Sequence, residues 1–94
     1  MKQDKVTEEK LKRYFKVSET ALNIAKEKII EGREKDAKEV IEMAKNYISD
    51  AHHFYGKKDF VNAFAALNYA HGWIDSGVRL GIFDVDDDKL FTVK

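Results

Sequence analysis

Apolar and small side chains recur along residues 6–31 at alternating intervals of four and three, which places them on one face of a helix. Lys and Glu fill the opposite face, and such a seam is typical of a helix in a bundle. The seam positions are Leu11, Phe15, Ser18, Leu22, Ala25 and Ile29. Gly32 can adopt the left-handed conformation that ends a helix. The pattern therefore predicts a first helix over about residues 6–31.

The same spacing returns over residues 34–55 and predicts a second helix. Its seam positions are Ala37, Ile41, Ala44, Ile48, Ala51 and Tyr55. Acidic side chains lie near its start, where the helix dipole favours negative charge. Gly56 is the predicted stop signal, and the chain contains no proline that would interrupt a long helix.

The stretch from residue 59 to residue 83 is the most apolar part of the chain, with only Asp59, Asp75 and Arg79 charged. Asp59 is a suitable N-cap for a third helix over about residues 59–80. One seam consists of Phe60, Phe64, Leu67, His71, Ile74 and Val78, and a second stripe of Ala63, Ala66, Ala70, Trp73 and Gly77. Two apolar stripes predict two packing partners, so this helix should lie against both others.

Glycines and short connections complete the predicted architecture. We expect Gly77 to mark close packing and Gly81 to end the third helix. Both connections are short, so consecutive helices should be antiparallel neighbours. The sequence predicts an all-α fold, a closed up-down-up three-helix bundle that forms one domain over residues 1–94. Residues 82–94 form a short irregular C-terminal tail, whose Leu90, Phe91 and Val93 either lie back on the bundle or dock on another chain.

Composition excludes several kinds of partner. The 94 residues include 17 basic and 17 acidic side chains, so no overall field steers the chain onto nucleic acid or an anionic membrane. There are no cysteines, hence no disulfides and no thiolate zinc site. No apolar run approaches the roughly 20 residues of a membrane span, and the first ten residues lack the apolar core of a signal peptide. We expect a cytoplasmic protein, and the abundant Lys and Glu favour a thermophilic source.

No catalytic, metal or cofactor motif is present. The chain lacks a phosphate-binding loop, a dinucleotide fingerprint and a zinc-protease motif, so we expect no enzyme and no cofactor. His71 should lie about 12 Å along the bundle axis from His52 and His53, too far for shared metal ligation. The alternating aspartates from Asp84 onward resemble the start of a calcium loop, but Lys89 stands where that loop needs glycine.

A polar stripe on the third helix is the best candidate for a binding surface. Asn68, His71, Asp75 and Arg79 recur at intervals of three and four residues. Together, His, Asp and Arg side chains could bind a phosphate or a carboxylate. The alternative interpretation is that the stripe is the solvent-facing side of an otherwise buried helix.

The stretch KDFVNAFAALNYAHGWIDSGVRLGIF at residues 58–83 resembles the archaeal domain-of-unknown-function 357 family. DAKEVIEMAKNYISDAHHF at residues 36–54 fits as well, and the resemblance covers roughly residues 8–85. It implies a small archaeal protein that forms a three-helix bundle. It implies no established activity, so no functional residues carry over.

Two hypotheses about function follow. The first is a non-enzymatic interaction or structural module that associates with itself or with a protein partner, because Trp73, the small-residue face and Phe91 offer contact surfaces. The alternative is a small-ligand or nucleotide-binding domain that uses the polar stripe. Neither hypothesis calls for a membrane or for nucleic acid.

Overall fold

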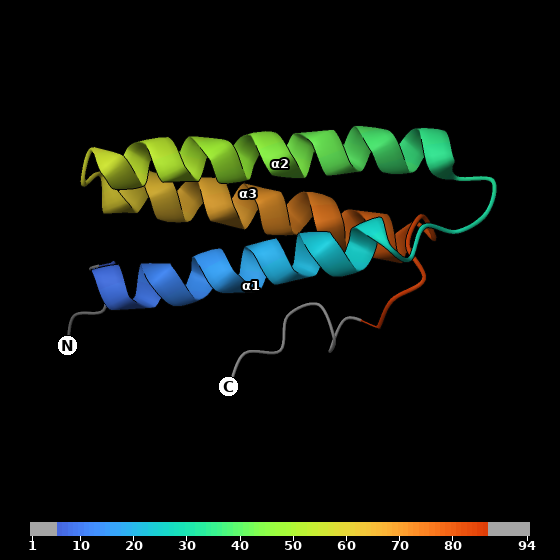
Figure 1. Cartoon of the computed structure of the whole chain (residues 1–94), viewed down its shortest axis with the longest axis horizontal. Coiled ribbons are helices and arrows are strands. Elements are labelled where there is room, and N and C mark those ends of the chain that lie inside the picture. The colour runs from blue at the N-terminus through green and yellow to red at the C-terminus, as the bar shows by residue number, and fades with distance from the viewer. Residues whose placement is uncertain (1–5, 87–94) are drawn as a thin grey trace.

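Three helices form most of the described chain. The computed structural model describes residues 6–86, with α1 at Glu8–Lys26, α2 at Glu34–Gly56 and α3 at Phe60–Arg79. In Figure 1, α1 and α3 run in one direction and α2 runs in the other. The predicted all-α, up-down-up three-helix bundle is confirmed.

The predicted seams meet in one core. Buried side chains come from all three helices and include Leu11, Phe15, Leu22, Ala44, Ile48, Leu67 and Ile74. The small residues of the second stripe on α3, Ala63, Ala66, Ala70 and Gly77, are buried as well. Burying one Leu or Ile side chain stabilises the fold by about 1.5–3 kcal/mol. The central position predicted for α3 is therefore correct, since α1 and α2 each pack against it more extensively than against each other.

Side-chain caps fix where two of the helices begin. The Thr7 hydroxyl accepts a hydrogen bond from the Lys10 amide at 3.1 Å, at the start of α1. The Asp59 carboxylate accepts one from the Asn62 amide at 3.3 Å, at the start of α3. Asp59 is thus the N-cap that the sequence predicts, and a cap of this kind contributes about 1 kcal/mol.

The first helix is shorter than its apolar pattern predicts. It ends at Lys26 rather than at residue 31, and Gly32 lies in the following loop instead of capping the helix. The Ile30 amide donates to the Ile82 carbonyl at 2.9 Å, and the Asp84 amide donates to the Lys28 carbonyl at 2.7 Å. These bonds frame an antiparallel bridge between Ile29 and Phe83. Ile29 therefore reaches the core from an extended segment.

Phe83 follows the last helix and belongs to the core. Its side chain is 2% exposed, and its ring packs against the backbone of Gly77. Gly81 has a φ of +76° and turns the chain after Leu80, so the predicted helix terminator is correct. The predicted tail from residue 82 onward begins with Ile82 and Phe83, which lie outside any helix and are buried through their pairing with residues 28–30. Leu90, Phe91 and Val93 lie outside the described residues.

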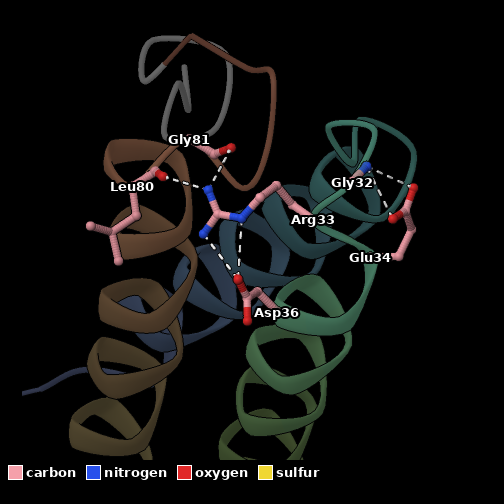
Figure 2. Close-up of polar contacts among 6 residues, drawn as sticks. All are labelled: Gly32, Arg33, Glu34, Asp36, Leu80 and Gly81. Carbon is pink, nitrogen blue, oxygen red and sulfur yellow. Dashed lines mark hydrogen bonds and ion pairs between the residues drawn. The ribbon is translucent and has the colours of Figure 1, made fainter.

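Arg33 links the start of α2 to the segment that follows α3 (Figure 2). Its Nη1 donates to the carbonyl oxygens of Leu80 at 3.0 Å and Gly81 at 3.4 Å. Its Nε and Nη2 both donate to Asp36 Oδ2, at 3.1 and 3.0 Å. One planar guanidinium therefore joins the first turn of α2 to the end of α3, where carbonyls lack partners within the helix.

Replacing Gly77 by Ala should destabilise the protein by about 1–3 kcal/mol. The added methyl would overlap the buried Phe83 ring, whose Cδ2 would lie 2.7 Å away. Chemical denaturation measures the change. Gly72→Ala is the matched control, because a Cβ there meets nothing within 4 Å. This control should gain about 0.5–1 kcal/mol. Equal stabilisation of both variants would contradict the packing described.

Replacing Arg33 by Ala should lower the free energy of unfolding by about 1 kcal/mol, since the carbonyls of Leu80 and Gly81 lose a charged donor. Hydrogen exchange should also accelerate at the Ile82 and Asp84 amides. Lys35→Ala, at an exposed position in the same turn, should change neither quantity. Unchanged hydrogen exchange in the Arg33 variant would show that the hydrogen bonds of Arg33 do not stabilise this end of the bundle.

Candidate functional site

The side of α3 that faces solvent carries a strip of apolar and small side chains, with the exposed Arg79 beside it near the C-terminal end of the helix. We call it the outer stripe, made of Val61, Ala65, Tyr69, Gly72, Ser76 and Leu80. Val61 is 63% exposed, Tyr69 62% and Leu80 67%, and these are the large hydrophobic side chains exposed among residues 6–86. Isolated exposed apolar residues are common on protein surfaces. Here all of them align on a single helix.

The other two helices present a different surface. The exposed positions of α1 and α2 are mostly charged: Glu8, Glu9, Lys12, Arg13, Lys16, Glu19, Lys26, Glu34, Lys35, Asp36, Lys38, Glu39, Glu42, Lys45 and Asp50. A solvated helix face usually looks like this. The outer stripe of α3 departs from that pattern and is the candidate functional site.

Tyr69 forms a ridge between two shallow hollows in the outer stripe. One hollow is lined by Ala65, Asn68 and Tyr69. The other is lined by Asn68, Tyr69, Gly72, Trp73 and Ser76. The Tyr69 ring stacks on Tyr47 of α2, with centroids 5.2 Å apart and planes 26° apart. This contact restricts the orientation of the Tyr69 ring.

The four residues of the predicted polar stripe do not converge on one pocket. Asn68 is exposed and borders both hollows of the outer stripe. Arg79 Nε donates to Asp75 Oδ2 at 2.8 Å, so these two side chains form an ion pair with each other. His71 is half-buried against α1, where its ring lies parallel to that of Tyr14 at 6.4 Å between centroids. Ligand binding by these residues stays a prediction.

Burial lowers the pKa of His71 below its ordinary value of 6.5, because the apolar surroundings disfavour the charged imidazolium. The folded chain therefore binds this proton less tightly than the unfolded chain does. Below pH 6.5 the unfolded state takes up more protons, so the free energy of unfolding falls as the pH drops from 6.5 toward the lowered value. Above pH 6.5 this contribution is constant.

The melting temperature should therefore decrease between pH 7.5 and pH 5, and His71→Gln should reduce that decrease. Replacing the imidazole removes the group whose protonation opposes folding. Differential scanning calorimetry across this range measures the effect. His53→Gln, at an exposed position on α2, is the control and should retain the wild-type slope. Identical slopes in all three proteins would exclude His71 as the source.

A second groove lies between α1 and α2, and the sequence patterns did not reveal it. It is lined by Glu19, Leu22, Asn23, Lys45, Ile48, Ser49 and His52. His52 Nε2 lies 3.0 Å from Glu19 Oε2, and its ring stacks on Phe15 at 4.3 Å. Only the packing of α1 on α2 brings these side chains together, since Glu19 and His52 are far apart in the chain. In residues 6–86, no group of three or more His, Asp or Glu side chains could hold a metal ion.

A family model described as a protein of unknown function (DUF357) matches residues 13–83. The chain belongs to the DUF357 family. This confirms the resemblance carried by residues 58–83. Searches of curated proteins and of solved structures found no match. The DUF357 region extends to Phe83, so it includes the whole outer stripe and the residue that closes the end of the bundle.

Proposed function

We propose that this DUF357 protein is a non-enzymatic interaction module that docks a protein partner on the outer stripe of α3. The observation that carries the proposal is the alignment of the exposed Val61, Tyr69 and Leu80 on one face of the helix. No helix of residues 6–86 is long and apolar enough to cross a membrane.

The chemistry of the stripe suits a protein contact. Burying a Val or Leu side chain contributes about 1.5–3 kcal/mol each. None of the six stripe residues is charged, and Arg79 on the same face is paired with Asp75. The small residues Ala65, Gly72 and Ser76 allow a partner's backbone to approach closely. Tyr69 is the expected centre of the binding energy, because tyrosines that are already fixed in place make good anchors.

The same face is poorly equipped for catalysis. Acid–base chemistry needs a histidine, carboxylate or amine within reach of the reacting atom. The outer stripe has only the hydroxyls of Tyr69 and Ser76. This supports a binding role over an enzymatic one.

The ligand-binding alternative is favoured less by the geometry. Asp75 and Arg79 already bond to one another, and an anion would have to compete with the carboxylate for the guanidinium. Of the four predicted residues, only Asn68 lines a hollow of the outer stripe.

We place the protein in the cytoplasm. The chain contains no cysteine, which suits a reducing compartment where disulfides do not form. An archaeal, thermophilic source stays a prediction from composition and family resemblance.

Replacing Tyr69 by Lys should abolish partner binding while the fold persists. The substitution sets a strongly hydrated charge at the centre of the outer stripe, and it loses the stack on Tyr47, which is worth about 0.5–1.5 kcal/mol. Binding is measured in two ways: light scattering of the purified protein up to high micromolar concentration, and affinity capture from lysate of the source organism.

Thr20→Lys is the matched control, because Thr20 is an exposed, uncharged position on the charged face of α1. The partner of the wild type is either a second copy or another protein. In either case Thr20→Lys should bind the same partner as the wild type, and Tyr69→Lys should not bind it. Equal binding by both variants would refute a role for the outer stripe. So would a wild type that stays monomeric and captures nothing.

A further inference from the structure

We infer that the groove between α1 and α2 binds a small amphipathic anion, a molecule with a carboxylate or phosphate group at one end and a short apolar body. Every residue that lines this groove belongs to α1 or α2, so the site is separate from the outer stripe on α3. The inference therefore stands independently of the proposed function.

The groove is open because α1 and α2 make the least extensive contact of the three helix pairs. Its volume of about 470 Å³ lies within the range of about 300–1,000 Å³ that is usual for small-molecule sites. Leu22 and Ile48 form its floor, and their side chains are 8% and 7% exposed. An apolar body that lies on this floor loses contact with water on one side, which favours binding.

One end of the groove is occupied by contacts within the protein. The His52 ring stacks on Phe15 at 4.3 Å between centroids, and His52 Nε2 lies 3.0 Å from Glu19 Oε2. The acidic side chain of the groove therefore already has a partner. A cationic ligand would have to compete with His52 for the Glu19 carboxylate.

The other end of the groove carries a positive charge. Lys45 precedes His52 by seven residues, which is about 10 Å along the helix axis. Lys45 is exposed, and the ion pairs formed among residues 6–86 do not include it. Ser49 lies one turn from Lys45 on α2, and Asn23 lies one turn from Glu19 on antiparallel α1, in the direction of Lys45. Both supply neutral hydrogen-bond donors.

These positions give the ligand one orientation. Its anionic group binds at Lys45, because a charge-assisted hydrogen bond forms there and because Glu19 repels an anion from the opposite end. Its apolar body lies over Leu22 and Ile48 toward His52. The distance of about 10 Å between the two ends leaves room for a body of about six carbon atoms.

The expected affinity is low. The groove leaves one side of the ligand in water, and the polar side chains along it are exposed, so solvent screens the attraction between Lys45 and the anion. A titration followed by nuclear magnetic resonance detects such weak binding and locates it residue by residue.

The full-length ¹⁵N-labelled protein is titrated, in a buffer without carboxylate or phosphate, with hexanoate, hexyl phosphate, 1-hexanol, hexylammonium and acetate. Hexanoate or hexyl phosphate should cause saturable shifts that are confined to the amides of residues 19–23 and 45–52. A response to one of these two anions alone supports the inference and identifies the anionic group. Acetate lacks the apolar body and should bind about tenfold more weakly. Hexanol and hexylammonium should also bind more weakly than the better anion.

Lys45→Gln should weaken binding of the better anion about fivefold, because the side chain keeps its size and a donor but loses its charge. Lys38→Gln is the matched control. It removes the same charge from an exposed position on α2, about 10 Å farther from the groove along the axis, and should bind as the wild type does. Melting temperatures equal to the wild type's show that both variants are folded.

Four outcomes would overturn the inference. The first is the absence of a saturable shift with either six-carbon anion, and the second is a set of shifts centred outside the groove. The third is binding of hexanol or hexylammonium as tight as that of the anions, since the site would then not select a negative charge. The fourth is equal weakening by Lys45→Gln and Lys38→Gln, or no weakening by either.

Discussion

A helix in a three-helix bundle has two neighbours, so part of its circumference always remains in solvent. This constraint governs α3. Its two inner stripes are covered by α1 and α2, and Leu67 and Ile74 are fully buried. In most bundles the remaining side is charged, as it is on α1 and α2 here. On α3 it is partly apolar and carries few charges, with Arg79 exposed near its end, which leaves one face of the molecule unlike the others.

The closed end of the bundle fixes how that face is presented. The Phe83 ring lies on Gly77, Ile29 bridges to Phe83, and Arg33 binds the carbonyls that follow α3. Together these contacts tie the segment after α3 to the loop between α1 and α2. Leu80 is thereby held outward at the end of the stripe, while Ile82 and Phe83 turn inward. The same few contacts that complete the core also set one end of the candidate interface.

Much of the fold could be read from the chain, but the site could be read only in part. The polar residues Asn68, Asp75 and Arg79 are visible in the sequence as a stripe, because they recur at helical spacing. The sequence did not predict the outer stripe, although its intervals are also helical. Val61, Tyr69 and Leu80 are apolar, and an apolar residue is by itself a candidate for the core. Periodicity assigns residues to faces, but it does not say which of three faces lacks a neighbour.

The sequence by itself determined the three helices, their order, the cap at Asp59 and the packing of both inner stripes toward the core, because these depend on local periodicity and on contacts between adjacent turns. Tertiary structure alone decided that α1 ends at Lys26 and that residues 28–30 pair with residues 82–84. It also decided which side of α3 meets solvent. Those features arise where segments far apart in the chain come together, and the free energy of such contacts is not encoded in either segment alone.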